Sequence, residues 1–163
     1  MTEKRLKILF FIEGLTDIRF ITGLNAICDL TLAVSGPPFR QSLADRITQA
    51  GLKVPIDEIP GGRLAFQARS LFYLWRRIRD FDAVISQEVL RGSLNATLIG
   101  RLRGVPVITY MGVSPLEYFR CRRERKQIGW LASMAGQFVI WSLVRLNGIF
   151  LSEVHSVNTC NKS

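Results

Sequence analysis

The sequence predicts an α/β fold: a Rossmann-like, doubly wound parallel sheet with helices on both faces, formed by a single domain. Two observations predict it. Short runs of β-branched and aromatic residues alternate along the chain with segments of helical periodicity. These runs are apolar on both faces, so they need cover on both faces, which crossover helices between parallel strands supply. The length of 163 residues, of which 48% are hydrophobic, suits one domain with a sizeable core.

The N-terminal part of the chain predicts a strand, a helix and a second strand. The run KILFFI at residues 7–12 is apolar and rich in β-formers, and a polar glycine turn ends it. A helix is expected at about residues 17–28, because apolar side chains recur there at helical spacing: Ile18, Ile21 and Leu24. The second strand, DLTLAV at residues 29–34, stops at the turn sequence SGPP.

The middle of the chain predicts two helices around a weaker strand. Residues 40–50 have a helical pattern that Gly51 ends as a C-cap. Residues 54–59 predict a weaker strand, because Pro55 interrupts the run. Residues 63–79 predict a strong helix with a set of apolar residues on one face: Leu64, Ala68, Leu71 and Trp75.

The last predicted elements are a strand, a helix and a strand. The strand at residues 83–86 follows an acidic turn and stops at Ser-Gln-Glu. The helix at residues 93–102 carries leucines at every fourth position, Leu94, Leu98 and Leu102, and Gly104 ends it. The fifth strand, VPVITY at residues 105–110, is ended by Met111-Gly112.

Polar and glycine residues follow the predicted strands at the point where each strand ends. In an open parallel sheet, ligands bind beyond the carboxyl ends of the strands. We therefore expect a cleft at that edge, and the residues expected to line it are Gly14, Thr16, Ser86, Gln87, Glu88 and Gly112. Ordinary polar turns are the alternative explanation for any single one of these residues.

The segment from Phe81 to Pro115, FDAVISQEVLRGSLNATLIGRLRGVPVITYMGVSP, resembles the N-terminal, acceptor-side domain of GT-B glycosyltransferases of the family-four type. Such proteins show an Asp-bearing strand, a helix, a Gly-Val-Pro turn and a further strand, where this chain has Asp82, residues 104–106 and residues 107–112. The beginning, KILFFIEG followed by TDIRFITGLNAICDLTLAV, is also similar to the family's first elements. The resemblance covers residues 7–147. It implies a glycosyltransferase N-terminal domain at residues 1–147 and a polar C-terminal tail at residues 148–163.

The resemblance implies binding of a sugar or lipid-linked acceptor, and retaining transfer of a sugar from a nucleotide-sugar donor. In this family a second, C-terminal domain holds the donor. The chain therefore resembles an isolated or truncated acceptor-side half that lacks its donor-binding domain and is inactive alone. Neither a cofactor nor a metal is implied, since the nucleotide sugar is a co-substrate of a full-length relative.

Glu88 is the candidate catalytic residue. Relatives often carry histidines after the fourth and fifth strands, and this chain has none there. Glu88 could instead accept a proton from an acceptor hydroxyl. The alternative role of Glu88 is a favourable negative charge at the N-terminus of the following helix.

A basic stretch, RCRRERK at residues 120–126, precedes a long apolar segment at residues 129–146. The uncharged part of that segment spans about 22 Å as a helix, shorter than the ~30 Å hydrocarbon core, so it is not expected to cross a membrane. One alternative is a helix packed on the sheet, with solvated arginines before it. The other is peripheral contact with an anionic membrane or other anion, for which the contact residues are Arg120, Arg122, Arg123, Arg125, Lys126, Trp130 and Trp141.

The composition argues against several classes of function. The net charge of +9 favours an anionic partner, but the sequence lacks zinc-finger, basic-zipper and RNA-binding aromatic signatures, which disfavours nucleic acid. Three cysteines without CxxC spacing and a single histidine, His155, argue against a metal site and a disulfide framework. Reduced cysteines and the lack of a secretory signal indicate the cytoplasm, with the inner face of the membrane as the place of any peripheral contact.

Two functions remain open at this point. The first is a glycosyltransferase-like acceptor-binding domain that transfers a sugar only when a C-terminal donor domain is supplied. The alternative is a non-catalytic Rossmann-like interaction module that binds an anionic membrane surface or a partner protein.

Overall fold

The computed structural model describes residues 5–12, 16–61, 63–87, 92–111, 115–125, 129–147 and 150–152. Within these residues, strands form one sheet in the order β3-β2-β1-β4-β5-β6, and each neighbouring pair is parallel. The strands are β1 (Lys7–Ile12), β2 (Asp29–Ser35), β3 (Ile56–Ile59), β4 (Ala83–Gln87), β5 (Val107–Met111) and β6 (Phe150–Ser152). The helices are α1 (Ile18–Ile27), α2 (Pro37–Gln49), α3 (Arg63–Arg77), α4 (Gly92–Arg103), α5 (Pro115–Glu124) and α6 (Trp130–Asn147), and a short 3-10 turn, η1 (Ile78–Asp80), follows α3.

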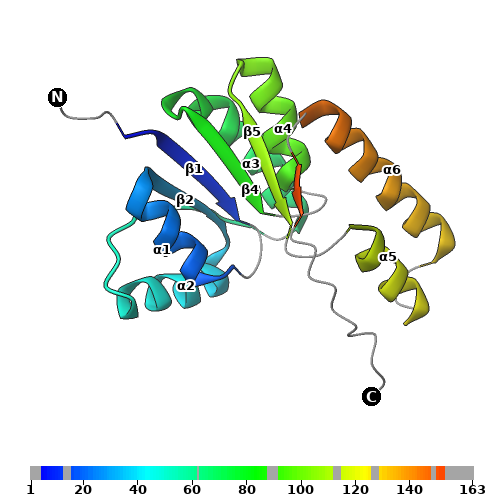
Figure 1. Cartoon of the computed structure of the whole chain (residues 1–163), viewed down its shortest axis with the longest axis horizontal. Helices are drawn as coiled ribbons and strands as arrows, with labels where there is room; N and C mark the ends of the chain where they lie inside the picture. Colours follow the sequence, from blue (N-terminus) through cyan, green and yellow to red (C-terminus); the bar gives the residue numbers. More distant parts are fainter. Residues whose placement is uncertain are drawn as a thin grey trace.

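The helices cover both faces of the sheet, as the sequence predicts. From β1 the chain passes through α1 and α2 toward the β3 edge, and Figure 1 shows these two helices in front of the sheet. α3 then returns the chain behind the sheet to β4, and α4 also lies behind it. The strand order therefore reverses between β1 and β4. The predicted doubly wound parallel sheet is confirmed.

The central strand β1 feeds two hydrophobic cores. Leu9 and Phe11 are fully buried in the core under α3 and α4, whereas Phe10 and Ile12 are fully buried in the core under α1 and α2. Burying one such side chain stabilises a fold by about 1.5–3 kcal/mol. A strand covered on both faces needs a continuous apolar run, and this is why KILFFI does not alternate with polar residues.

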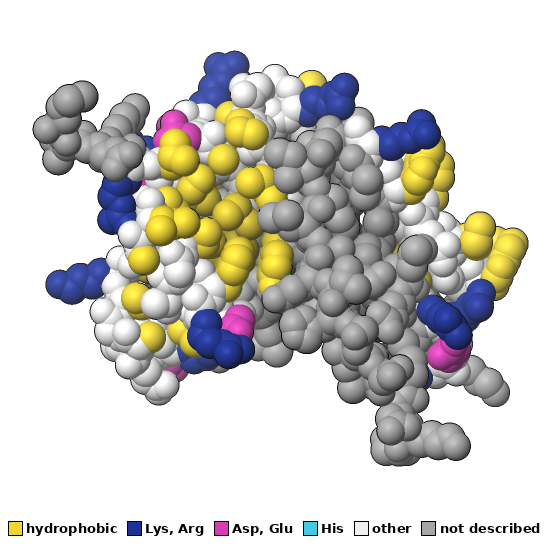
Figure 2. Space-filling model, in the orientation of Figure 1, with side chains coloured by type: hydrophobic (Ala, Val, Ile, Leu, Met, Phe, Trp, Pro, Cys, Tyr) yellow, Lys and Arg dark blue, Asp and Glu magenta, His cyan; other side chains and the backbone are white. Residues whose placement is uncertain are grey.

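The side of β4 and β5 that faces α1 is only partly covered. Phe20 of α1 stacks on Tyr110 of β5 with ring centroids 4.8 Å apart, and it meets Phe10 edge-on at 5.4 Å. Beyond Phe20, Ala83 and Ile108 remain half-buried. Apolar side chains accordingly gather on the surface beside α1 (Figure 2).

α4 lies close to the sheet because two of its glycines face the strands. A Cβ atom at Gly92 would overlap the ring of Phe11, and one at Gly100 would overlap Val107. The bulky leucines of the helix therefore point the other way: Leu94, Leu98 and Leu102 are 40%, 49% and 63% exposed. The leucine repeat that identifies this helix in the sequence is thus its outer face.

The buried face of α3 also differs from the apolar face read from the sequence. Phe66, Ser70 and Leu74 are buried, whereas Ala68 and Trp75 of the expected face are exposed. Both stripes of α3 contain large apolar residues, so hydrophobic spacing alone does not distinguish them. The stripe that packs in the core against the sheet is the one that carries Phe66 and Leu74.

Prolines explain where three elements begin. α2 begins at Pro37, three residues before the predicted start, since proline is favoured in the first turn of a helix. β3 and β5 begin after Pro55 and Pro106, which have no N–H to donate to a neighbouring strand. Their carbonyls still accept hydrogen bonds of 2.9 Å, from Leu32 and Val84 respectively.

Two elements were not predicted. α5 lies over the first part of the basic stretch, and β6 lies in the region assigned to the polar tail, residues 148–163. β6 pairs with β5 through Thr109 and Phe150, so the sheet extends beyond the predicted domain end at residue 147.

Candidate functional site

The carboxyl ends of β1, β4 and β5 lie side by side at one edge of the sheet. Ile12 is paired with Gln87, and Ser86 is paired with both Phe11 and Thr109. The predicted cleft residues Gly14, Glu88 and Gly112 lie outside the described residues. The strands that precede them all end at this edge, which is the edge where open parallel sheets bind ligands.

Ser86 lies inside the protein, beneath the start of α4. Its hydroxyl and that of Ser93 share a hydrogen bond of 2.8 Å, and both side chains are 0% exposed. A hydroxyl in this position joins the end of β4 to the first turn of α4. The contacts therefore give Ser86 a positioning role, and its predicted contact with an acceptor stays a prediction.

Thr16 is buried in the connection between β1 and α1. Its backbone carbonyl accepts a hydrogen bond of 3.1 Å from Arg46 Nη1 of α2, which ties this connection to a second helix. The hydroxyl of Thr16 is buried and has no hydrogen-bond partner among the described residues. A buried hydroxyl without a partner is uncommon in native structures, and one at a strand-end edge is available to a polar ligand or water.

Arg46 was not identified from the sequence. It lies in the middle of a polar helical segment, and no local motif distinguishes it from the other surface arginines. Only the fold brings it within reach of Thr16, thirty positions away.

The N-terminus of α1 is already occupied by a side chain. The Asp17 carboxylate caps the helix by accepting a 2.9 Å hydrogen bond from the backbone N–H of Arg19. The Arg19 guanidinium also binds this carboxylate at 2.7 Å and holds the pKa of Asp17 below its ordinary value. Asp17 therefore stays ionised at neutral pH, as the negative partner of an ion pair with Arg19 near the cleft edge.

Gln87 is the last residue of β4 and is half-buried. Because side chains alternate along a strand, it points to the sheet face opposite Ser86. Together, the Gln87 amide and the Thr16 hydroxyl offer hydrogen-bond donors and acceptors suited to a hydroxylated ligand. No cluster of three potential metal-ligating side chains occurs in the described part of the chain.

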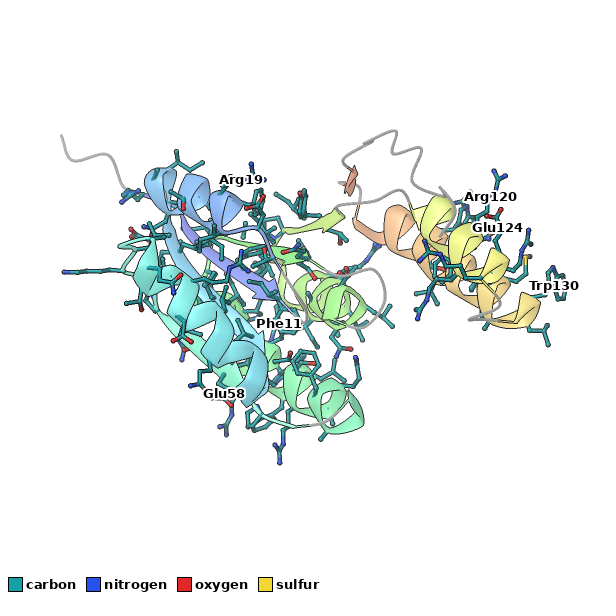
Figure 3. All side chains as sticks on the ribbon, turned by 90° about the horizontal axis from the view of Figure 1, so that it is seen from below. Phe11, Arg19, Glu58, Arg120, Glu124 and Trp130 are labelled. Atoms are coloured by element: carbon teal, nitrogen blue, oxygen red, sulfur yellow. The ribbon has the colours of Figure 1, made fainter. Side chains whose placement is uncertain are left out.

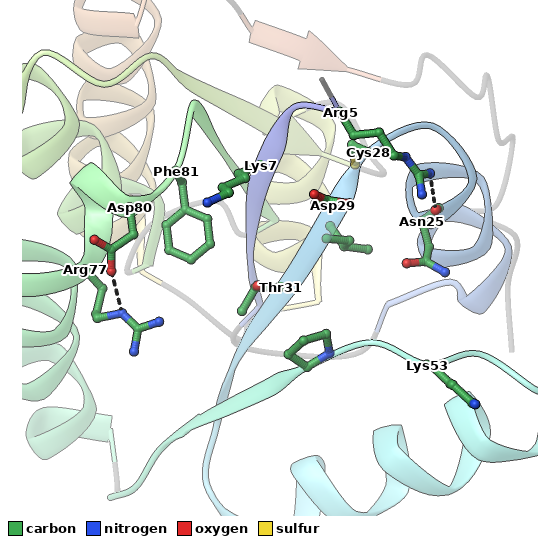
Figure 4. A pocket seen from close by; sticks show the side chains of 12 residues that line it. Arg5, Lys7, Asn25, Cys28, Asp29, Thr31, Lys53, Arg77, Asp80 and Phe81 are labelled. Carbon is green, nitrogen blue, oxygen red and sulfur yellow. Dashed lines mark hydrogen bonds and ion pairs between the residues drawn. The ribbon is translucent and has the colours of Figure 1, made fainter. Parts of the chain in front are cut away.

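The opposite, amino edge of the sheet carries a depression of about 560 Å³ (Figure 4). Four cations line it: Arg5, Lys7, Lys53 and Arg77. Arg5 donates hydrogen bonds of 2.9 and 2.6 Å to the last carbonyls of α1, and Arg77 pairs with Asp80 at 2.9 Å. Arg5 thereby offsets the negative, C-terminal end of the α1 dipole. Because the depression lies at the starts of the strands, it is distinct from the predicted cleft at their carboxyl ends.

Most of the predicted contact residues of the basic stretch lie on α5 and α6, two helices that pack against each other. Arg120, Arg122, Arg123 and Arg125 are exposed, and Arg120 pairs with Glu124 at 2.9 Å. Trp130 and Trp141 of α6 are 62% and 50% exposed. Figure 3 shows Arg120, Glu124 and Trp130 at the side of the molecule away from the β3 edge. Lys126 lies outside the described residues.

No protein-family model and no curated protein sequence matches this chain. Solved structures do match in fold. The chain is similar to the UDP-GlcNAc 2-epimerase of Methanocaldococcus jannaschii, with a TM-score of 0.61 and 10% identity over 91% of this chain and 40% of that one. It is similar to S. aureus MnaA, solved with UDP, with a TM-score of 0.59 and 10% identity over 90% and 37% of the two chains.

A third similar structure is MurG of Acinetobacter baumannii, with a TM-score of 0.50 and 14% identity, covering 90% of this chain and 41% of that one. These neighbours are GT-B-fold, glycosyltransferase-like and epimerase proteins. The chain therefore has the fold of one Rossmann-like part of such proteins, and it spans about 40% of the length of these three structures.

Proposed function

We propose that this chain is the acceptor-side, N-terminal half of a GT-B glycosyltransferase of the family-four type, which transfers a sugar only together with a donor-binding half. The observation that supports it best is the alignment of the β1, β4 and β5 ends at the edge next to the point where the strand order reverses. Ligands of open α/β sheets bind at such a point. Neighbours of the same fold carry UDP or UDP-GlcNAc in their names, and more than half of each neighbour lies outside the match.

In this proposal the acceptor lies across the carboxyl edge. The Thr16 hydroxyl and the Gln87 amide hydrogen-bond to acceptor hydroxyls, and Gly14 and Gly112 let the acceptor approach the backbone. Ser93 and Arg46 position this edge, through Ser86 and Thr16 respectively. Glu88 accepts the proton of the attacking hydroxyl. A metal or cofactor has no assigned role, and the donor nucleotide is bound by the other half.

The test is a fusion of this chain to the donor-binding half of a GT-B glycosyltransferase. UDP-GlcNAc is the first donor to try, and release of UDP in the presence of a lipid extract is the readout. We expect Glu88→Gln to lower the rate by about 100-fold or more, because a general base contributes roughly 10²–10⁴-fold, with no change in the free energy of unfolding. Glu124→Gln, which removes a surface carboxylate of α5, is the matched control and should leave the rate unchanged.

Equal rate losses in the Glu88 and Glu124 variants would remove the catalytic assignment.

The second candidate is a non-catalytic interaction module in the cytoplasm that binds an anionic membrane surface or a partner protein. The exposed arginines of α5 and tryptophans of α6 favour it. It predicts that no donor half restores sugar transfer, while binding to an anionic partner persists.

A further inference from the structure

The depression at the amino edge of the sheet is large enough for a small-molecule ligand. Its volume of about 560 Å³ lies within the range of about 300–1,000 Å³ that is usual for such sites. The starts of β1 and β2, the segment before β3, the end of α1 and the turn η1 all contribute to its lining. The proposed acceptor cleft lies at the other end of the strands, so the depression takes no part in the proposed sugar transfer.

Positive charge exceeds negative charge in this depression. Four basic and two acidic side chains line it, but the one basic side chain that pairs with a lining carboxylate is Arg77, which lies 2.9 Å from Asp80. Arg5 binds the last carbonyls of α1, and none of the described carboxylates pairs with it. Within the described part of the chain, the ammonium groups of Lys7 and Lys53 have neither a hydrogen bond nor an ion pair. Unpaired cations that line a hollow attract an anionic ligand.

Groups that can bind hydroxyls lie among these cations. Asp29 is paired with Lys7 in the register of β1 and β2, and Thr31 follows two residues later, so the three side chains extend from the same face of the sheet. Figure 4 shows Asp29 and Thr31 on β2, with Lys7 to one side and Lys53 to the other. A carboxylate accepts hydrogen bonds, and a threonine hydroxyl both donates and accepts them. Together with the Asn25 amide, these groups suit the hydroxyls of a sugar.

Two features argue against other kinds of ligand. Phe81 is the aromatic residue among the described residues that line the depression, and it is only 9% exposed. The depression therefore offers no open ring on which a nucleotide base could stack. The Cys28 thiol is buried and donates a 3.0 Å hydrogen bond to the carbonyl of Leu24, and burial raises its pKa, so it is not a nucleophile for a covalent ligand.

We propose that the amino-edge depression binds a sugar phosphate. The phosphate lies against the unpaired cations, and the sugar hydroxyls hydrogen-bond to Asp29, Thr31 and Asn25. Lys7 of β1 and the segment before β3 lie two strand spacings apart, about 10 Å, with β2 between them. A free phosphate ion therefore reaches one side of the depression, whereas a sugar phosphate meets both a cation and the polar groups of β2.

Such a ligand would connect elements from both faces of the sheet. The end of α1, in front of the sheet, and the end of α3, behind it, both line the depression. A ligand that binds only the folded state raises the free energy of unfolding, so occupancy should be visible as a higher Tm. No residue of the carboxyl edge is involved. The inference therefore goes beyond the proposed function, and failure of one leaves the other standing.

The test is a calorimetric titration of the full chain with glucose 1-phosphate and glucose 6-phosphate at constant ionic strength. Glucose and inorganic phosphate are the comparison ligands. We expect saturable binding of at least one sugar phosphate, accompanied by a rise in Tm. Both comparison ligands should bind at least about tenfold more weakly, because each of them lacks one part of the contacts.

Variants test the two parts of the site separately. Lys7→Gln with Lys53→Gln should lower the affinity for the sugar phosphate about tenfold or more, because hydrogen bonds to charged groups are among the stronger ones. Thr31→Val removes a hydroxyl while keeping the shape, and should weaken the sugar phosphate about fivefold without changing the affinity for inorganic phosphate.

The matched control is Arg122→Gln with Arg123→Gln, which removes the same net charge from α5. It should change the affinity by less than about twofold, since exposed charges far from a ligand are largely screened. Thermal unfolding without ligand establishes that all variants are folded.

Three results would overturn the proposal: no saturable binding of either sugar phosphate, equal losses in the lysine and arginine pairs, or a comparison ligand that binds as tightly as the sugar phosphates. Tight binding of inorganic phosphate would reduce the depression to a site for any anion. UMP is a further arm of the titration. If UMP binds more tightly than both sugar phosphates, the depression is a nucleotide site and the assignment to sugar phosphates is wrong.

Discussion

Gly92→Ala is expected to destabilise the fold by about 1–3 kcal/mol, the usual effect of an added methyl group in a tightly packed core. The structure gives the reason. The new Cβ would overlap two atoms of the Phe11 ring, and Phe11 is fully buried at the centre of the sheet. Neither group can move freely, because Phe11 also packs on Phe66 with ring centroids 5.8 Å apart. The strain must therefore shift the first turn of α4 away from β1 and β4.

Urea unfolding followed by circular dichroism measures this change, on the assumption of a two-state transition. Gly23→Ala is the matched control, because Gly23 lies inside α1 and its added Cβ would meet nothing within 4 Å. The control should stabilise the protein by about 0.5–1 kcal/mol, through the higher helix propensity of alanine. Replacing Phe11 by leucine in the Gly92→Ala background should recover part of the loss.

The reasoning is refuted if Gly92→Ala leaves the free energy of unfolding unchanged or raises it, as Gly23→Ala is expected to do. In that case the distance between α4 and the sheet is not set by Phe11. The position of Ser93, and with it the geometry of the carboxyl edge, would then need another explanation.

Two further measurements test single contacts. Ser93→Ala should lower the free energy of unfolding by about 1–3 kcal/mol, because it removes the partner of the buried Ser86 hydroxyl. The double variant with Ser86→Ala should lose less than the sum of the two single variants. If the two losses simply add, the 2.8 Å contact carries no coupling energy. Burial, aided by the 2.7 Å hydrogen bond to Asp57, raises the pKa of Tyr73 above its ordinary value near 10. The phenol therefore ionises at a lower pH in the unfolded chain than in the folded one. The free energy of unfolding should accordingly fall above pH 10, by up to about 1.4 kcal/mol per pH unit. Tyr73→Phe should make that alkaline loss shallower in urea titrations between pH 9 and 11, and an unchanged slope would contradict the assignment.

The fold was predictable because its signals are local. KILFFI and DLTLAV are continuous apolar runs, and such runs identify strands covered on both faces. The observed strands β1 and β2 begin at the expected residues, Lys7 and Asp29. The three-residue strand β6 was missed because so short a segment carries no periodicity. α5 was missed because a charged helix with few apolar residues resembles a solvated loop.

The faces of the helices were less predictable, for a physical reason. A hydrophobic stripe identifies a buried face only when the opposite face is in water. α4 carries a leucine stripe on one side and small, closely packed residues such as Gly100 and Ala96 on the other. Hydrophobic size therefore predicts the wrong buried face for this helix. The supporting contacts of the carboxyl edge are equally invisible in the sequence. Arg46 meets Thr16, and Ser93 meets Ser86, only after the crossovers have placed their helices.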